Sequence, residues 1–281
     1  MTESDQFKNK VAVITGAGSG IGRGLAEHAA KHKMRIVLAD VNEESLNKTL
    51  EIVKDMGTEA IARVTDVSSI DEVHNLASQT YETFQSCNLL FNNAGVLGPA
   101  PIDEINREMY EWLININLGG CFNGIQAFLP KMKESGDESH IVATCSTSGF
   151  IAYPMLSLYS ASKFGIRGLM TAMRAELTHS NVGVSIVCPG EVTTNIINST
   201  FISPNSSKDT QAEDQDPNDL LEEAAADAKN TFPISPNEAA EAIFAGIQQK
   251  EFYIFTHKGY KRQLEEISNE YLEAFDRAMF Q

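Results

Sequence analysis

Short apolar runs alternate with longer amphipathic stretches along residues 10–188 of the chain. The apolar runs are rich in β-branched residues, which predicts strands buried on both faces of a sheet, at residues 10–15, 35–39, 60–65, 89–92, 140–145 and 182–188. Between them, apolar residues recur every three or four positions, which predicts helices at 21–33, 43–56, 70–84, 104–133 and 157–179. Strands that alternate with helices form right-handed βαβ units, so we expect an α/β fold with a doubly wound parallel sheet flanked by helices on both faces.

The alternation stops after residue 194. Residues 195–235 form an acidic insertion with little strand or helix pattern, for which we expect either a solvated loop or a lid over the substrate. The lid hypothesis rests on scattered apolar side chains, namely Phe201, Ile202, Leu220, Leu221 and Phe232. Because all the predicted strands can share one sheet, residues 1–281 are expected to form a single domain.

Residues 257–281 are predicted to form an amphipathic helix. Its apolar residues are spaced by three or four and form one stripe, Leu264, Ile267, Tyr271, Phe275 and Met279. Such a stripe either packs on its own subunit or forms a subunit interface, and the pattern does not separate the two.

The excess of acidic side chains argues against negatively charged partners. The chain has 22 basic and 38 acidic side chains, and a net charge of −16 repels nucleic acid and anionic lipid. The first ten residues are polar, and no apolar stretch approaches the roughly 18 residues of a membrane span, so we expect a cytoplasmic protein. The four cysteines are widely separated and include no Cys-x-x-Cys pair, so we expect buried thiols rather than a disulfide framework or a zinc site.

Two histidines of the first predicted helix, His28 and His32, are four residues apart. That spacing is compatible with zinc, but no third ligand is evident in the sequence. We therefore expect two histidines on the helix surface and no metal.

A glycine-rich run, Thr15-Gly16-Ala17-Gly18-Ser19-Gly20-Ile21-Gly22, joins the first strand to the first helix. A glycine-rich turn in this position lets backbone amides approach a pyrophosphate at the positive end of the helix. Asp40 ends the second strand twenty residues beyond Gly20, where a carboxylate can accept hydrogen bonds from adenosine ribose hydroxyls. A 2′-phosphate would meet like charge there, and neither Val41 nor Ser19 offers a cation, so the sequence favours NAD over NADP.

Tyr159 and Lys163 lie four residues apart on a predicted helix, so a phenol and an ammonium share one face. A buried ammonium beside a phenol stabilises the phenolate, which can act as a general base. By itself the spacing is more typical of a surface helix pair, and the other motifs decide the interpretation.

Taken together, the motifs resemble the short-chain dehydrogenase/reductase family over about residues 9–194. The matching features are the Thr-Gly-x-x-x-Gly-x-Gly pattern of Thr15–Gly22, Asp66, the run Asn92-Asn93-Ala94-Gly95, Asn117, Ser146, the Tyr159/Lys163 pair and Pro189-Gly190. Ser146 precedes Tyr159 by 13 residues, the separation usual in this family. Cys145 is a departure, because many members have serine there.

The resemblance implies a role for each of these residues. Tyr159 would be the general acid/base, Lys163 would hold the nicotinamide ribose and favour the phenolate, Ser146 would hydrogen-bond the reacting oxygen, and Asn117 would position a water in a proton relay. It also implies the cofactor-binding residues Gly16, Ser19, Gly20, Ile21, Gly22, Asp40, Asp66, Val67, Asn93, Ala94, Gly95, Tyr159, Lys163, Pro189, Gly190, Val192 and Thr194. Members of the family are usually dimers or tetramers, so a homo-oligomer is expected.

The residues near the catalytic positions suggest an apolar substrate pocket, formed by Leu97, Phe150, Ile151, Tyr153 and Leu156 together with Glu191. The sequence thus predicts an NAD-dependent oxidoreductase that interconverts a secondary alcohol and a ketone, on a hydrophobic steroid, terpenoid or aryl substrate. The alternatives are an NADPH-dependent reductase of a ketoacyl or sugar ketone, and a catalytically silent NAD-binding sensor.

Overall fold

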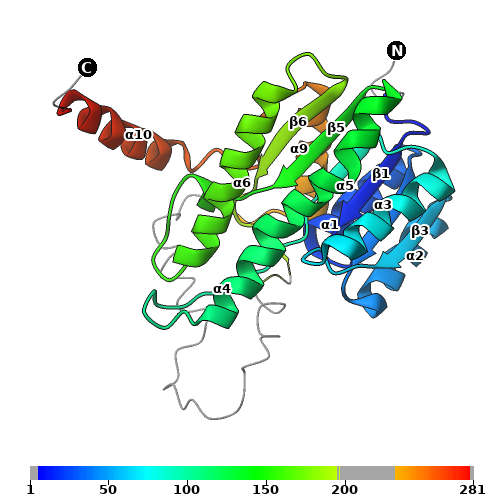
Figure 1. Cartoon of the computed structure of the whole chain (residues 1–281), viewed down its shortest axis with the longest axis horizontal. Helices are drawn as coiled ribbons and strands as arrows, with labels where there is room; N and C mark the ends of the chain where they lie inside the picture. Colours follow the sequence, from blue (N-terminus) through cyan, green and yellow to red (C-terminus); the bar gives the residue numbers. More distant parts are fainter. Residues whose placement is uncertain (1–5, 195, 197–231, 279–281) are drawn as a thin grey trace, which may run out of the picture.

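The computed structural model describes residues 6–194, 196 and 232–278, which contain a seven-stranded sheet (Figure 1). The strands are β1 (Val11–Thr15), β2 (Arg35–Asp40), β3 (Ala60–Val64), β4 (Leu89–Asn92), β5 (Ser139–Thr144), β6 (Val182–Cys188) and β7 (Tyr253–Phe255). All neighbouring strands are parallel, in the order β3-β2-β1-β4-β5-β6-β7. The chain winds outward in both directions from β1 and β4, which confirms the predicted doubly wound α/β fold of Rossmann type.

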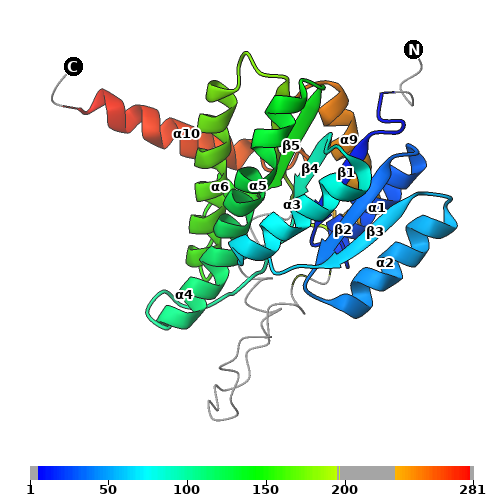
Figure 2. The ribbon, with the colours of Figure 1, turned by 45° about the vertical axis from the view of Figure 1, so that its right-hand side comes forward.

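Helices cover both faces of the sheet (Figure 2). One face is covered by α1 (Gly20–Lys31), α2 (Glu43–Asp55) and α9 (Pro236–Gln248), and the other by α3 (Ile70–Phe84), α5 (Gly120–Ser135) and α6 (Ser157–Glu176). Leu25, Leu46 and Phe244 are each at most 1% exposed on the first face. A fully buried side chain of this size stabilises the fold by roughly 1.5–3 kcal/mol, so packing on the sheet holds the helices in place.

Two elements of the structure were not predicted from the sequence, α9 and β7. Helix α9 begins with a capping box, in which the Ser235 side chain accepts from the Glu238 amide and the Glu238 carboxylate accepts from the Ser235 amide, with Pro236 at the first helical position. This Ser-Pro-Asn-Glu start is a signal that could have revealed the helix. Strand β7 has only three residues, too few for a hydrophobic pattern to be distinctive.

The single long helix predicted over 104–133 is interrupted. The structure has α4 (Arg107–Ile114), a π-helical turn (Asn115–Gly119) and then α5. In the turn, the buried Asn117 side chain is hydrogen-bonded to the backbone of Val96, which holds the widened turn against a neighbouring loop. Single π turns inside helices are frequent at functional sites.

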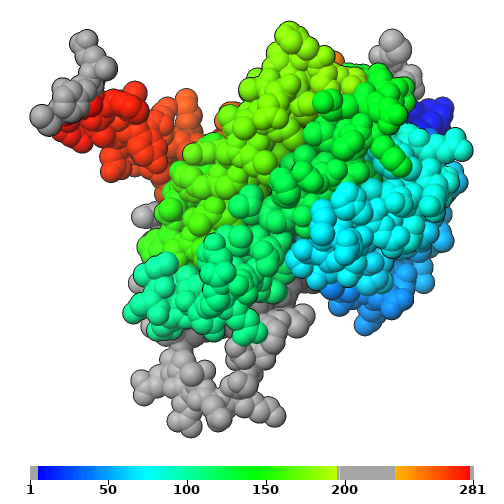
Figure 3. Space-filling view, in the orientation of Figure 1, coloured from blue at the N-terminus to red at the C-terminus, as the bar shows by residue number. Residues whose placement is uncertain are grey.

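The C-terminal helix α10 (Lys261–Asp276) extends away from the body of the protein (Figures 1 and 3). No residue within α10 is buried, and Tyr271 and Phe275 are 57% and 78% exposed. Within the described part of the chain, Tyr271 and Phe275 of the predicted apolar stripe are therefore not buried, and the subunit interface stays a prediction. Residues 195, 197–231 and 279–281, which include most of the predicted acidic insertion and Met279, lie outside the described residues.

The cysteine prediction is confirmed, because all four thiols are free and buried. The histidine prediction was wrong in one respect, since His28 and His32 are half-buried rather than on the helix surface. Their ring centroids are 5.0 Å apart, and the His28 ring lies 4.7 Å from the Phe244 ring. Helix α9, absent from the sequence prediction, supplies Phe244 and so covers the histidines.

We expect His140 in β5 to make the stability of the fold pH-dependent. Its Nε2 atom lies 2.7 Å from Ser185 Oγ, and burial lowers its pKa from 6.5 to about 4. His140 takes up a proton more readily in the unfolded chain than in the folded protein. Its contribution to the stability of the fold is therefore complete above pH 6.5 and is lost as the pH falls toward 4. Between pH 7.5 and 5 this one group should cost about 2 kcal/mol of unfolding free energy.

Urea unfolding at both pH values measures that loss. The His140→Gln variant keeps a hydrogen-bond donor but does not titrate, so it should lose about 2 kcal/mol less than the wild type over the same interval. An equal loss in both proteins would contradict the assignment of the effect to His140.

Candidate active site

A cavity of about 1530 Å³ lies at the carboxyl ends of the central strands, where the direction of winding changes. In open α/β sheets this is where ligands bind. Most residues proposed from the sequence line it, namely Gly16, Ser19, Gly20, Ile21, Asp40, Asp66, Val67, Asn93, Ala94, Gly95, Leu97, Ser146, Tyr153, Leu156, Tyr159, Lys163, Pro189, Gly190, Glu191, Val192 and Thr194. The structure thus brings together residues from both halves of the chain in one cavity.

Four of the proposed residues lie outside the cavity lining, Gly22, Asn117, Phe150 and Ile151. Phe150 instead packs against Phe255 of β7, with ring centroids 5.3 Å apart, and Ile151 is buried in the protein interior. The expectation that these two side chains form the substrate pocket is therefore not met. A short 3₁₀ turn at Thr147–Gly149 changes the direction of the backbone immediately before Phe150 and Ile151.

The glycine-rich loop has the shape that a dinucleotide requires. Gly16 has φ +64°, a conformation that favours glycine. A Cβ atom at Gly22 would lie 2.0 Å from the carbonyl oxygen of Gly16, so only glycine lets helix α1 approach the loop this closely. This close approach leaves the N-terminal end of α1 facing the cavity, which is the arrangement that binds pyrophosphate.

Asp40 is oriented by two backbone amides. Its Oδ2 accepts from the Gly18 amide at 2.8 Å, and its Oδ1 accepts from the Asn42 amide at 2.9 Å. Each carboxylate oxygen keeps a lone pair that a ribose hydroxyl can use. The loop and this carboxylate together fit an adenine dinucleotide.

The ends of β1, β4 and β5 are connected by side chains around Thr15. Thr15 Oγ1 accepts from the amides of Asn93 and Ala94 at 2.9 and 3.1 Å, and Asn93 Nδ2 donates to the Thr15 carbonyl. From β5, Thr144 Oγ1 donates to Asn93 Oδ1 at 3.1 Å. These bonds hold the Asn93–Gly95 loop over the middle of the cavity.

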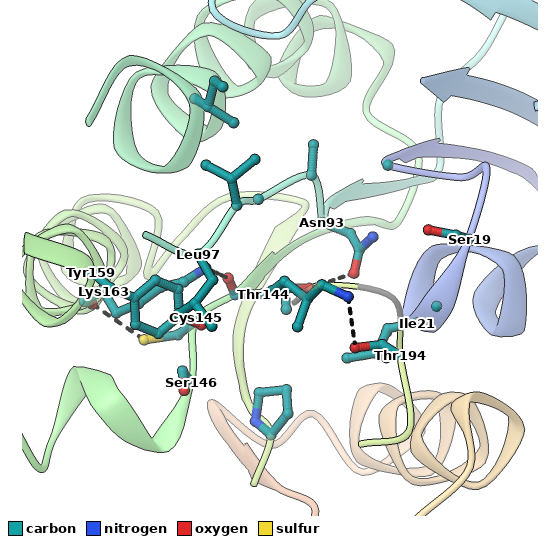
Figure 4. A pocket seen from close by; sticks show the side chains of 18 of the residues that line it. Ser19, Ile21, Asn93, Leu97, Thr144, Cys145, Ser146, Tyr159, Lys163 and Thr194 are labelled. Atoms are coloured by element: carbon teal, nitrogen blue, oxygen red, sulfur yellow. Dashed lines mark hydrogen bonds between the residues drawn. The ribbon is translucent and has the colours of Figure 1, made fainter. Parts of the chain in front are cut away.

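Tyr159 and Lys163 lie at the opposite end of the cavity from Ser19 and Ile21 (Figure 4). Both side chains are buried, at 8% and 3% exposure. Lys163 Nζ donates to the Thr144 carbonyl at 3.0 Å and lies 5.4 Å from the centroid of the Tyr159 ring. The ammonium is therefore fixed beside the phenol, and the surface-pair interpretation of this spacing is wrong.

Ser146 and Cys145 follow β5 into the same cavity. Ser146 Oγ accepts from the Ser148 amide at 3.1 Å, which leaves its own O–H to donate toward the cavity. Cys145 Sγ donates to the Lys163 carbonyl at 3.2 Å, and burial raises the pKa of this thiol. The cysteine that departs from the family pattern thus supports the backbone of α6 as a neutral group.

Asn117 is linked to the same helix by Ser162, which was not proposed from the sequence. Asn117 Nδ2 donates to the Val96 carbonyl and to Ser162 Oγ, at 3.0 and 3.1 Å, and Ser162 donates in turn to the Tyr159 carbonyl at 2.7 Å. Asn117 Oδ1 accepts from the Val96 amide at 2.8 Å. Both N–H groups of Asn117 are used, so its remaining capacity toward water is one lone pair of Oδ1.

The structure adds lining residues that sequence reasoning missed, chiefly Glu108, Glu111 and Trp112 from α4 and Tyr260 from the segment before α10. The His257 and Tyr260 rings pack so tightly on Gly190 that a Cβ atom there would lie 2.6 Å from Tyr260 Cε2. Trp112 is the only tryptophan of the chain, and its helix was predicted. Which face of α4 meets the cavity depends on packing that the sequence pattern does not encode.

Comparison with known proteins gives consistent matches. A family model described as short chain dehydrogenase matches residues 10–204. The crystal structure of a short-chain dehydrogenase/reductase from Burkholderia phymatum in complex with NAD is 32% identical, with a TM-score of 0.87 over 98% of each chain.

Two curated relatives match at 30% identity. One is a C alpha-dehydrogenase of Sphingobium sp., aligned over 92% of this chain and 84% of its own length. The other is a CLA biosynthesis dehydrogenase/reductase of Lactiplantibacillus plantarum, aligned over 92% of both chains. Within the residues that the structure describes, no helix has the length and apolar character needed to span a membrane.

Proposed function

Because the chain belongs to the short-chain dehydrogenase family and is therefore an oxidoreductase, we propose that it interconverts a secondary alcohol and a ketone with NAD as its cofactor. The observation that carries the proposal is the shared cavity, which has the glycine-rich loop and Asp40 at one end and Ser146, Tyr159 and Lys163 at the other. A dinucleotide held by the first group would extend toward the second within this one cavity.

NAD, when bound, supplies the acceptor for the hydride that leaves the alcohol carbon. The loop of Gly16–Ile21 would bind its pyrophosphate, Asp40 its adenosine ribose, and Lys163 its nicotinamide ribose. The remaining cofactor contacts are assigned to the other lining residues proposed above. Thr194 is packed directly on Gly20 of the loop, since a Cβ on Gly20 would lie 3.1 Å from Thr194 Cβ.

Tyr159 is the proposed general base. Its phenolate oxygen takes the hydroxyl proton of the alcohol, and in the reverse direction its phenol returns a proton to the ketone oxygen. The Lys163 ammonium lies 5.4 Å from the centroid of the ring, which places a positive charge beside the proposed base. Ser146 donates a hydrogen bond to the same substrate oxygen and stabilises the negative charge that develops there.

Asn117 is proposed as a positioning residue rather than a direct participant. The space beside Gly95 adjoins both Asn117 and Lys163, because a Cβ added to this glycine would be 3.3 Å from Asn117 Oδ1 and 3.5 Å from Lys163 Nζ. A side chain at residue 95 would fill this space, and glycine leaves it open. A water in that space would accept from Lys163 and donate to the free lone pair of Asn117, as the proposed proton relay requires.

A screen of secondary alcohols of graded size tests the proposed function. We expect NADH to form with at least one alcohol that carries an apolar ring, and the same protein to oxidise NADH when given the matching ketone. Absorbance of NADH measures both directions. Tight NAD binding without NADH formation from any alcohol in a broad panel would favour the silent sensor instead.

A further inference from the structure

Ser162 lies in the helical turn that also carries Tyr159 and Lys163, and its side chain is fully buried. Its hydroxyl group donates to the Tyr159 carbonyl at 2.7 Å, a bond that serine commonly makes to its own helix. A hydroxyl group has a single hydrogen, so Ser162 Oγ can act only as an acceptor toward any other group. The group that donates to it is the side chain of Asn117, whose Nδ2 atom lies at 3.1 Å.

The π-helical turn that carries Asn117 packs closely against this part of α6. A Cβ atom at Gly165 of α6 would lie 2.9 Å from Leu118 Cδ2, so glycine is what allows the two segments to approach. Asn117 is only 1% exposed between them. A buried N–H group without an acceptor destabilises a protein, and Ser162 supplies the acceptor for the second N–H of the Asn117 amide.

Two neighbours hold the Asn117 amide in different ways. Val96 determines which end of the amide is oxygen, because its backbone N–H can only donate to Oδ1 and its carbonyl can only accept from Nδ2, at 2.8 and 3.0 Å. Both of these contacts are to the loop that follows β4. Ser162 makes the contact to α6 and so holds the amide in place relative to Tyr159 and Lys163.

The oxygen of the same amide adjoins the space proposed for the relay water. A Cβ atom added to Gly95 would lie 3.3 Å from Asn117 Oδ1 and 3.5 Å from Lys163 Nζ, so both groups border one small space. A single water there has to lie within hydrogen-bond distance of both atoms. The relay is therefore sensitive to a shift of Asn117 relative to α6.

We propose that Ser162 is a positioning residue, which ties Asn117 to the helical turn of Tyr159 and Lys163 and so sets the spacing across which the relay water is held. Ser162 is not part of the cavity lining, so it acts through Asn117 rather than on the substrate. This inference rests on the proposed function and adds a residue to the proton relay of that site.

Ser160 provides a matched control in the same turn of α6. It is 3% exposed and lies outside the cavity lining, and its Oγ atom has no hydrogen-bond partner within the described part of the chain. Ser162→Ala and Ser160→Ala therefore each remove one oxygen atom from a buried position. Only the first change breaks the bond to Asn117.

We expect Ser162→Ala to lower kcat by about tenfold with the best alcohol of the screen, because a relay water held at the wrong spacing transfers its proton poorly. The KM for NAD should change by less than about twofold, and Ser160→Ala should keep nearly full kcat. In an Asn117→Ala background, Ser162→Ala should lower kcat by less than about twofold, since the group that it positions is already absent.

The solvent isotope effect separates a relay role from a structural role. Slower proton transfer should raise the ratio of kcat in H₂O to kcat in D₂O in Ser162→Ala, whereas Ser160→Ala should leave this ratio as it is in the wild type. A loss of stability alone would lower kcat equally in both solvents.

Urea unfolding tests the bond between Ser162 and Asn117 without any need for turnover. Ser162→Ala should unfold at a lower urea concentration than the wild type, because it leaves a buried N–H of Asn117 without an acceptor. The shift should be smaller in the Asn117→Ala background, where that N–H does not exist. Equal shifts in the two backgrounds would show that Ser162 does not hold Asn117 and would overturn the proposal.

Full kcat in Ser162→Ala, equal losses of kcat in Ser162→Ala and Ser160→Ala, or an unchanged isotope ratio would also overturn the proposed role of Ser162. NADH formation by the wild type tests the proposed function separately. If no alcohol of the panel is oxidised, the proposed function fails, and the unfolding experiment still decides whether Ser162 ties Asn117 to α6.

Discussion

Replacing Tyr159 by Phe should lower turnover by about 10³-fold or more, while NAD binding changes by less than about threefold. The variant keeps the ring, which is 8% exposed and packs with Leu97, Leu113, Leu156 and Leu158, but removes the only atom that exchanges a proton with the substrate in the proposed mechanism. Lys163 keeps its bond to the Thr144 carbonyl and so can still hold the cofactor. Initial rates of NADH formation and a fluorescence titration with NADH measure the two quantities.

Tyr110→Phe is the matched control, because it removes a phenolic oxygen from an exposed residue of α4 that does not line the cavity. It should retain nearly full activity. Full activity in Tyr159→Phe would rule out the proposed acid/base role, and a large loss of NADH affinity in that variant would point to a structural defect instead.

The second large effect concerns the choice of cofactor. The wild type should bind NADH at least about 100-fold more tightly than NADPH, because a 2′-phosphate would meet the Asp40 carboxylate at close range. Of the described residues that line the cavity, only Lys163 is basic, and it lies at the opposite end from Ser19 and Ile21 of the glycine-rich loop, so no described cation of the cavity lining is placed to receive the 2′-phosphate.

Asp40→Asn removes the charge with almost no change of shape and keeps one of the two backbone hydrogen bonds, because its single oxygen can accept from only one of the Gly18 and Asn42 amides. The preference for NADH should fall to about tenfold or less, through tighter binding of NADPH and weaker binding of NADH. Parallel fluorescence titrations with the two reduced cofactors measure the ratio. Equal or tighter binding of NADPH by the wild type would refute the NAD assignment and revive the NADPH-dependent reductase.

Much of the fold is predictable from the sequence because its signals are local. Every residue of β1 is at most 4% exposed, and the run of apolar residues in this strand is the sequence signal for burial on both faces of the sheet. The glycines before α1 and the cap residues of α2 and α3, Asn42 and Ser69, act within one turn of chain. β7 was missed because it is too short to carry a hydrophobic period, and α9 because its capping signal was not recognised.

The residues of the candidate site likewise fall into those that local sequence predicts and those that it does not. The residues from Gly16 to Ile21, Asp40, Ser146, Tyr159 and Lys163 follow strand ends or share one helix face, so a parallel sheet brings them to one edge. Phe150 and Ile151 are close in sequence to Ser146, yet their side chains leave the cavity after the Thr147–Gly149 turn. A residue that is close to Ser146 in sequence must have its backbone near the cavity. The direction in which its side chain points depends instead on the local backbone angles.

The sequence by itself determined the α/β fold, the position of the glycine-rich loop and the residues proposed for proton transfer, because each depends on hydrophobic period, backbone freedom or helix spacing within a few residues. Only the tertiary structure decided the wall around the substrate. Glu108, Glu111, Trp112 and Tyr260 reach the cavity from α4 and from the chain after β7, segments far apart in sequence. Their convergence depends on packing across the sheet, and no local pattern specifies which face of each segment turns inward.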